Sequence, residues 1–142
     1  MSGGVTFETE EGHGSLAKFL DASIKAWSDR ITGPARRIWY SYAARTSEGD
    51  ICGGVACYIY RDVLLIDTLW LDDAYRGQGL GRQLMDMAER RGRDSGCAFA
   101  FLDTMNWQAR PFYEKLGYRV FHEFQMEGGK YTRFYMRKDF AP

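Results

Sequence analysis

An apolar run, a glycine-rich loop and a helical pattern follow one another in the middle of the chain. The run VLLIDTLWLD (63–72) is too continuously apolar for a strand with one face in water, and it predicts a central strand. The loop RGQGLG (76–81) leads into a helix that ends near Gly96, and CAFAFLDTM (97–105) predicts a second buried strand. A strand–helix–strand unit requires a right-handed crossover, so we expect part of the sheet to be parallel.

The other elements are predicted from periodicity and turn residues. Weak alternation favours a first strand over 5–10, and helical spacing favours a helix over 15–27 with Ser15 as its N-cap. The remaining predicted elements are two strands joined by a hairpin turn (36–46 and 50–62), a short helix (110–117) and two closing strands (118–126 and 132–140).

The predicted helix after the glycine loop is amphipathic. The residues expected on its core face are Leu80, Leu84, Met87 and Ala88. Glu89 is expected outside that face, as one half of a favourable pair with Arg93. With strands before and after it, the order of elements predicts a single domain, residues 1–142, of the α/β (α+β) class, with one mixed sheet and helices on its faces.

Composition excludes some classes of partner. The formal net charge of zero argues against a nucleic-acid partner, which would call for a basic excess. No targeting segment opens the chain and no apolar run is long enough to span a bilayer, so no membrane partner is expected. Cys52, Cys57 and Cys97 lie in apolar surroundings without metal-ligand spacing. They predict reduced core thiols in a cytoplasmic protein that holds no metal.

Three glycines at a helix start favour an anion-binding loop. The free N–H groups of a first helical turn, together with the positive end of the helix dipole, attract phosphate, and glycines let it approach the backbone. A plain tight turn is the alternative reading. The Walker A pattern fails because Arg82 and Gln83 follow Gly81, and the dinucleotide pattern fails because Arg82 stands where its third glycine belongs.

Two motifs give the chain a resemblance to a known family. Arg76, Gly79 and Gly81 form R-x-x-G-x-G at the junction of strand and helix, which resembles the acyl-CoA signature of the GNAT superfamily of N-acetyltransferases. Further on, NWQARPFYEKLGY (106–118) is similar to that family's N-x-x-A-x-x-F-Y-x-K-x-G-F/Y segment. The resemblance covers 64–120, and it implies the GNAT fold with a mostly antiparallel sheet and acetyl-CoA (coenzyme A) as co-substrate.

The resemblance also implies which residues bind the cofactor. Loop amides would hold the pyrophosphate, the end of the preceding strand would bond the pantetheine and the acyl carbonyl, and an asparagine would bond the pantetheine arm. The implied cofactor-binding residues are Leu69, Leu71, Arg76, Gly77, Gln78, Gly79, Leu80, Gly81, Arg82, Asn106 and Tyr113. Two of them have other readings: Arg82 as a solvated helix charge, and Asn106 as an N-cap of the short helix.

Two catalytic residues are expected. By the resemblance, Tyr113 is the general acid that protonates the leaving thiolate, with a core or rim tyrosine as the alternative. Asp67 lies inside an apolar strand, where burial could raise its pKa and make it a general base, or where it could be a structural acid with a partner. His122 and Glu123 are weaker candidates for the base.

Aromatic residues predict the nature of the acceptor. Those available for its site are Trp27, Trp39, Tyr40, Tyr42, Trp70, Trp107, Phe134 and Tyr135. Together with zero net charge they favour a small-molecule primary amine with an apolar or aromatic body. Direct attack in a ternary complex is expected, since no cysteine has a reactive setting. The alternatives are a non-catalytic acyl-CoA sensor and an enzyme acting on a protein amine. A homodimer formed through aromatic edge strands stays open.

Overall fold

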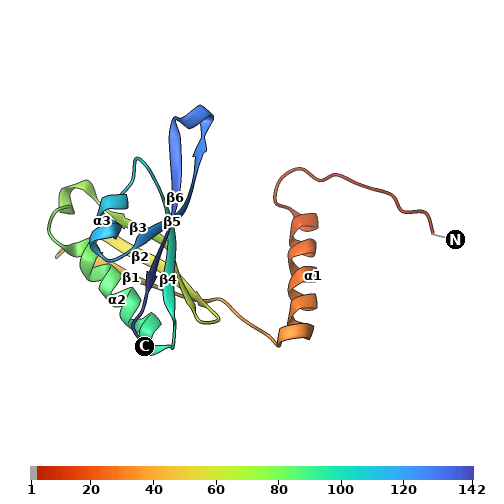
Figure 1. Ribbon diagram of the computed structural model, residues 1–142, viewed down its shortest axis with the longest axis horizontal. Coiled ribbons are helices and arrows are strands. Elements are labelled where there is room, and N and C mark those ends of the chain that lie inside the picture. The colour runs from red at the N-terminus through yellow and green to blue at the C-terminus, as the bar shows by residue number, and fades with distance from the viewer. Residues whose placement is uncertain (1–2) are drawn as a thin grey trace. The chain divides into compact units, whose positions relative to one another are not determined.

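The computed structural model describes residues 3–142, which divide into a first unit that ends at Ala35 and a second that spans Arg36–Pro142 (Figure 1). In the first unit, residues 3–14 have no regular secondary structure and helix α1 spans Ser15–Thr32. The expected strand over 5–10 is therefore wrong. Val5 and Phe7 are 76% and 95% exposed, and a short alternating run forms no strand without a partner for its backbone groups.

The start of α1 also differs from the expectation. Its N-cap is Gly14, and Ser15 is the first helical residue. Glu10 takes over the capping task, because its carboxylate accepts hydrogen bonds from the Ser15 hydroxyl and the Leu16 amide, each at 3.1 Å. A carboxylate at this end of a helix is stabilised by the free N–H groups and by the helix dipole.

The second unit contains one six-stranded sheet in the order β1-β2-β3-β4-β6-β5. The strands are β1 (Ile38–Arg45), β2 (Ile51–Tyr60), β3 (Val63–Leu71), β4 (Phe99–Met105), β5 (Arg119–Met126) and β6 (Tyr131–Asp139). Only the β3–β4 pair is parallel, and every other pair is antiparallel. The predicted mixed, mostly antiparallel sheet with a central β3 is confirmed, and so is the closing hairpin.

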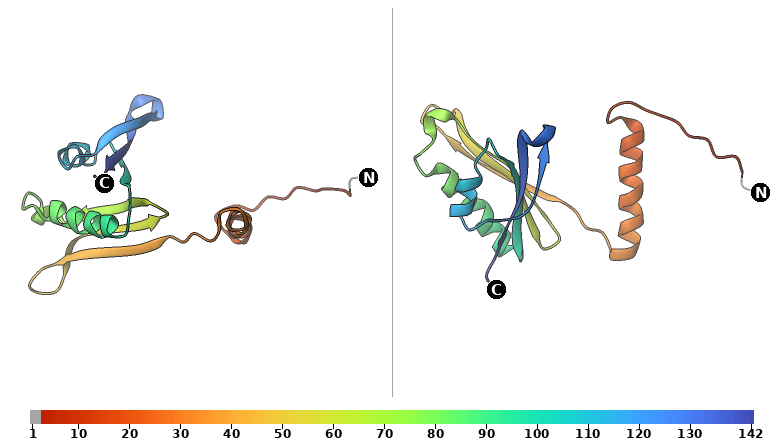
Figure 2. Two further views of the ribbon diagram at one scale, coloured as in Figure 1. Left: turned by 60° about the horizontal axis from the view of Figure 1, so that its bottom comes forward. Right: turned by 45° about the horizontal axis from the view of Figure 1, so that its top comes forward.

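The parallel pair separates after a few residues. β3 and β4 pair only over Val63–Leu65 and Phe99–Phe101, after which the strands diverge. Figure 2 shows the sheet opening on this line, with β1–β3 on one side and β4–β6 on the other. Backbone groups of β3 beyond Leu65 that face β4 therefore have no partner in that strand. This is the opening in which the site lies.

Two helices of this unit lie beside the opening. α2 (Leu80–Asp94) follows the short 3-10 helix Asp73–Tyr75 and the glycine loop. α3 (Arg110–Lys115) has a proline in its first turn, which costs no backbone hydrogen bond there. The core of the unit gathers side chains from α2, α3 and the strands; its largest fully buried members are Leu64, Met85, Leu102, Met136, Glu89, Val55 and Cys57.

The buried face of α2 is rotated from the predicted one. Met87 was expected in the core but is 46% exposed, whereas Glu89 was expected in solvent and is 1% exposed. The residues that α2 buries are Gly81, Leu84, Met85, Ala88, Glu89 and Gly92. Two glycines on this face let the helix approach the sheet closely, which decides the rotation. A periodicity count gives such residues no weight because they have no side chain.

The buried Glu89 is neutralised by partners from distant parts of the chain. Its Oε2 accepts a hydrogen bond from the Tyr118 hydroxyl at 2.9 Å, and its Oε1 lies 2.7 Å from Lys138 Nζ and 3.4 Å from Arg93 Nη2. Burial, and then the negative charge of Glu89, raise the pKa of Tyr118. The network ties α2 to the closing hairpin, because a buried carboxylate is stable only with such partners.

The cysteines are free and buried, as predicted. Burial raises the pKa of both Cys57 and Cys97, which keeps these thiols protonated and unreactive. Within residues 3–142, no helix combines the length and the hydropathy that crossing a membrane requires.

Candidate active site

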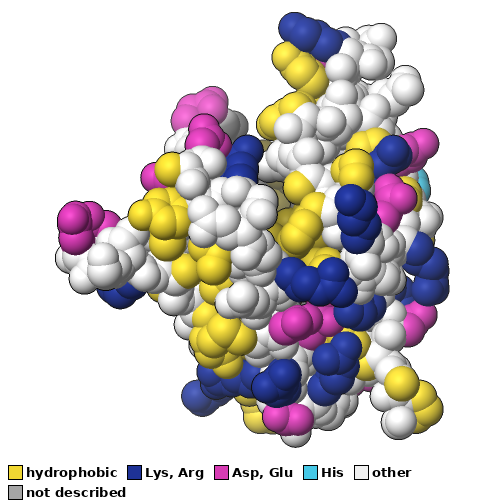
Figure 3. Space-filling view, turned by 90° about the vertical axis from the view of Figure 1, so that its left-hand side faces the viewer, with side chains coloured by type: hydrophobic (Ala, Val, Ile, Leu, Met, Phe, Trp, Pro, Cys, Tyr) yellow, Lys and Arg dark blue, Asp and Glu magenta, His cyan; other side chains and the backbone are white. Residues whose placement is uncertain are grey.

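A pocket of about 860 Å³ lies where β3 and β4 separate. Figure 3 shows it as a hollow with apolar side chains at its floor and basic side chains at its edges. The lining residues are Ile66, Asp67, Thr68, Leu69, Trp70, Leu71, Arg76, Gly77, Gly79, Leu80, Gly81, Arg82, Leu102, Asp103, Thr104, Trp107, Gln108, Ala109, Phe112 and Tyr113. Most of the residues predicted for the site are among them; Gln78 and Asn106 are not.

The glycine loop forms one end of the pocket. Gly77 and Gly79 have φ of 79° and 80°, and nothing lies within 4 Å of the position a Cβ would take at either residue. Gly79 is the N-cap of α2 and provides no side-chain cap. The first intrahelical bond runs from Gln83 N–H to the Gly79 carbonyl at 3.1 Å. The N–H groups of the first turn, which precede Gln83, thus have no partner within the helix, and N–H groups of this kind can bind an anion.

Two arginines add positive charge at the loop end. Both Arg76 and Arg82 line the pocket. Arg76 Nη2 lies 3.2 Å from an Asp73 carboxylate oxygen, but both side chains are largely exposed, at 64% and 89%. An exposed pair of this kind contributes little stability, so the Arg76 side chain is free to turn toward an anion in the loop.

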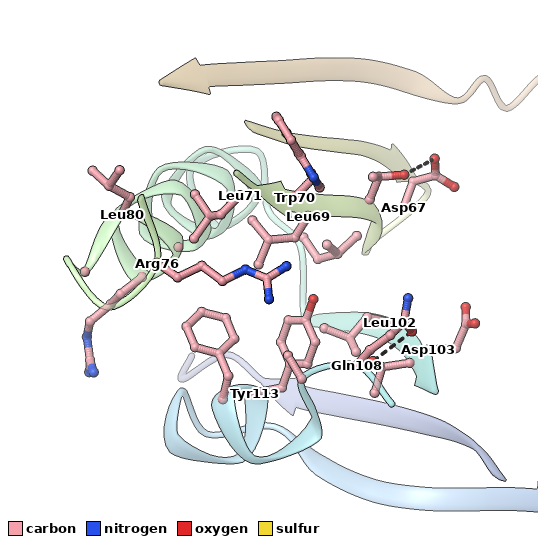
Figure 4. A pocket seen from close by; sticks show the side chains of 18 of the residues that line it. Asp67, Leu69, Trp70, Leu71, Arg76, Leu80, Leu102, Asp103, Gln108 and Tyr113 are labelled. Atoms are coloured by element: carbon pink, nitrogen blue, oxygen red, sulfur yellow. Dashed lines mark hydrogen bonds between the residues drawn. The ribbon is translucent and has the colours of Figure 1, made fainter. Parts of the chain in front are cut away.

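Tyr113 lies at the centre of the pocket. It is 8% exposed, and its hydroxyl points into the space between the two halves of the sheet (Figure 4). Tyr113 belongs to α3, and the ring of the neighbouring Phe112 packs edge-on against its ring, with 5.3 Å between the centroids. Burial, and then the charge of Asp103, raise the pKa of Tyr113 to about 12. The phenol is consequently a protonated donor throughout the neutral range, which is the state that a general acid needs.

Asp67 reaches the pocket through a β-bulge. In the pairing of β2 with β3, Ala56 opposes Thr68 and Cys57 opposes Ile66, so Asp67 is an extra residue with no opposite partner. The expected burial of Asp67 is wrong: it is exposed in the pocket, and Oδ2 accepts a hydrogen bond from the Thr68 hydroxyl at 3.2 Å. The bulge, which a single sequence does not reveal, leaves Asp67 without an opposite residue in β2, and the residue lines the edge of the pocket.

Asp103 is a pocket carboxylate that the sequence reasoning missed. The parallel pairing ends at Leu65 and Phe101, and Asp67 and Asp103 each follow two residues later, where the strands have separated. The signal was present, because VLLIDT (63–68) and FAFLDT (99–104) carry the same pattern of four apolar residues followed by Asp-Thr. Both carboxylates lie at the same end of the pocket, away from the glycine loop (Figure 4).

Asn106 bonds a neighbouring strand and does not line the pocket. Its amide N–H and its side-chain oxygen both bond Thr132 of β6, at 2.9 and 3.0 Å. The N-cap of α3 is Ala109, so the N-cap reading of Asn106 is wrong. Gln108, which was not predicted, lines the pocket instead; its Oε1 accepts hydrogen bonds from the Met105 amide and the Thr104 hydroxyl. The two bonds of Asn106 to Thr132 thus fasten the loop before α3 to β6.

Some of the aromatic candidates belong to the core and some line the pocket, whereas Trp27 and Trp39, at 53% and 52% exposed, do neither. Trp70 and Trp107 line the pocket and are 49% and 61% exposed. Tyr40 and Phe134 belong to the core, where the Tyr40 hydroxyl bonds the Ala88 carbonyl. His122 and Glu123, the weaker candidates for a base, lie on the exposed strand β5 and do not line the pocket.

Comparisons with known proteins agree with this arrangement. A match to the description "Acetyltransferase (GNAT) family" covers residues 7–118. Blasticidin-S acetyltransferase of Streptomyces morookaense is 37% identical over 82 residues, which are 57% of this chain and 60% of that protein. Glucosamine 6-phosphate N-acetyltransferase of Trypanosoma brucei brucei is 47% identical over 62 residues, which are 43% of this chain and 40% of that protein.

Solved structures extend the similarity over more of the chain. A crystal structure of an acetyltransferase from Bacillus cereus is 27% identical, with a TM-score of 0.81, and the match covers 94% of this chain and 98% of that one. The chain spans less than two thirds of the length of the two curated relatives. The fold is therefore that of the acetyltransferase structures.

Proposed function

Because the chain belongs to the acetyltransferase (GNAT) family, we propose that it transfers an acetyl group from acetyl-CoA to a primary amine of a small molecule. One observation carries the proposal. The opening between β3 and β4 brings an anion-binding loop, free backbone groups of β3 and a protonated Tyr113 into one pocket. These are the groups that a CoA thioester and its departing thiolate need.

The binding of the co-substrate is assigned to the loop end. First-turn amides of α2 and the guanidinium groups of Arg76 and Arg82 hold the pyrophosphate. Leu69 and Leu71 line the pocket on the stretch of β3 that has left its parallel neighbour, so backbone N–H groups there are available to the pantetheine and to the acyl carbonyl. An N–H aimed at that carbonyl stabilises the negative charge that develops on its oxygen during transfer.

The transfer itself uses Tyr113 and Asp67. The acceptor reaches the pocket as an ammonium and loses one proton to solvent. Its nitrogen then attacks the thioester carbonyl, so that a C–N bond forms and the C–S bond breaks. Asp67 takes the second proton of the nitrogen, and the Tyr113 hydroxyl gives its proton to the leaving sulfur. Exchange with solvent restores both side chains. No cysteine lines the pocket, which supports direct transfer without an acetylated enzyme.

A small-molecule acceptor is supported by two features. The pocket is a narrow opening between strands, lined by Trp70 and Trp107, and it suits a compact amine. Both curated relatives carry names that specify a small molecule, blasticidin S in one case and glucosamine 6-phosphate in the other.

Thermal unfolding with and without acetyl-CoA tests the proposal. At about a hundred times its dissociation constant, a ligand stabilises a protein by about 2.7 kcal/mol. For a chain of this size we expect Tm to rise by several degrees. Gly79→Glu fills the anion space with a carboxylate and should abolish the shift. Gly49→Glu is the matched control, since Gly49 also has positive φ (92°) and open space but lies outside the pocket. An equal shift in both variants would contradict the assignment of the loop.

A further inference from the structure

The pocket carries opposite charges at its two ends. Arg82 lies in the first turn of α2, directly after the glycine loop, and lines the pocket. Asp67 and Asp103 lie at the end of the pocket away from Arg76, with Tyr113 between (Figure 4). The arginine end matches the pyrophosphate under the proposed function. The carboxylate end is then the side from which the acceptor approaches.

One carboxylate oxygen of Asp103 is bonded to Arg133, and the other is available to a ligand. Arg133 Nε and Nη2 lie 2.8 and 2.6 Å from the same oxygen, Oδ2. Among the residues that the structure describes, none donates a hydrogen bond to Oδ1. The two side chains are 40% (Arg133) and 35% (Asp103) exposed, so water screens the pair and a second cation can share the carboxylate.

Asp103 lines the same pocket as Tyr113. Its negative charge is the second cause, after burial, of the raised pKa of that phenol. Tyr135 stands opposite Asp103 in the pairing of β4 with β6, and its ring stacks on Phe101 with 6.0 Å between centroids. The Arg133 guanidinium already lies over the Tyr135 ring, at 5.5 Å from its centroid, and neither ring lines the pocket. Recognition of a second cation therefore depends on the two carboxylates.

We infer that Asp103 selects the acceptor by binding, through Oδ1, a second positively charged group of a compact dibasic amine whose reacting nitrogen is received by Asp67. A monoamine needs only one of the two carboxylates. Its apolar body would take Oδ1 of Asp103 out of water with no hydrogen-bond donor, which disfavours it. This inference rests on the proposed function, and it makes Asp103 a specificity-determining residue.

Paired amines test the inference. Putrescine and butylamine differ by one amino group, as do p-xylylenediamine and benzylamine. With saturating acetyl-CoA, we expect kcat/KM to be at least about tenfold higher for a diamine than for its monoamine partner. Asp103→Asn should bring that ratio close to one, mainly through KM of the diamine. Arg133→Gln should raise the ratio, because it removes the cation that competes for Asp103.

Controls distinguish a failure of this inference from a failure of the proposed function. Glu114→Gln removes one negative charge from the exposed face of α3, where Glu114 pairs with Arg110, and should leave the ratio as it is. A ratio near one in the unaltered protein, or a ratio that Asp103→Asn does not change, overturns the inference. Acetyl-CoA binding without acetylation of any diamine also overturns it. A protein that does not bind acetyl-CoA refutes the proposed function itself.

Discussion

At the scale of single residues, the candidate site depends on the positions of Asp67, Asp103 and Tyr113. Asp67 is available because a bulge removes its opposite partner, and Tyr113 is a donor because α3 buries it under the open strands. Neither side chain has unusual chemistry by type. The fold would supply the reactivity that we propose for them, by burying the phenol and by leaving the carboxylate exposed in the pocket.

Tyr113→Phe tests the general acid. Loss of the hydroxyl should lower kcat about 100-fold, within the usual range for a general acid, while the acetyl-CoA-induced Tm shift persists. Tyr42→Phe, a half-buried tyrosine outside the pocket, is the control. Because the pKa of Tyr113 is raised to about 12, the unaltered enzyme should show no alkaline fall in kcat from this group below about pH 11. A fall centred near pH 10 would count against a buried phenol.

At the scale of elements, the contact between α2 and β3 determines the shape of the pocket. Gly81 and Gly92 both lie on the buried face of α2. A Cβ at Gly81 would meet Phe112 at 3.1 Å and Leu71 at 3.3 Å, and one at Gly92 would meet Leu64 at 2.9 Å. The helix lies against the strand because these positions have no side chain, and its N-terminus is thereby aimed at the opening.

The substitution Gly92→Ala tests whether this close contact lowers or raises the stability gained from an added methyl group. On helix propensity the change should stabilise α2 by about 1 kcal/mol. The structure predicts the opposite, because Leu64 is fully buried and cannot move away from the new methyl group, and overpacking of this kind costs about 1–3 kcal/mol. We expect a net loss of up to about 2 kcal/mol in urea unfolding. A gain in stability would show that α2 does not pack on β3 in this register.

At the scale of the whole molecule, several buried groups hold protons that the unfolded chain would release. Burial raises the pKa of Tyr40, Tyr113 and Tyr118 above 10.0 and that of Cys57 and Cys97 above 9.0. Above these reference values the folded state therefore binds more protons than the unfolded state. Their contribution to stability is complete at lower pH and is lost as the pH rises toward the folded pKa values.

Unfolding free energy against pH checks this linkage. Stability should be flat near pH 8 and fall above about pH 9, with each group that stays protonated adding about 1.4 kcal/mol per pH unit to the slope. Tyr118→Phe lowers stability at pH 8, since the bond to Glu89 is lost, but should make the alkaline slope shallower by one proton. Equal slopes in the two proteins would mean that Tyr118 titrates alike in the folded and unfolded states.

Local patterns in the chain were enough to predict most of the elements and the loop end of the site. The glycine loop, the buried strands and the short helix with Tyr113 depend on residues that are neighbours in sequence, so their periodicity and turn residues are visible there. The predicted strand over 5–10 failed because alternation means little without a pairing partner. The buried face of α2 was mispredicted because glycine carries no hydropathy signal.

Tertiary structure alone decided the carboxylate end of the pocket. Asp103 becomes a pocket residue only when β4 lies parallel to β3 and then separates from it, and Asp67 enters the pocket only through a register shift against β2. The burial of Glu89 depends on Tyr118 and Lys138, which come from distant parts of the chain, as well as on Arg93 of the same helix. Sequence by itself fixes which backbone can hold a phosphate, since that depends on adjacent residues. Which carboxylates face the substrate depends on how separate strands pair, and that is a property of the folded chain.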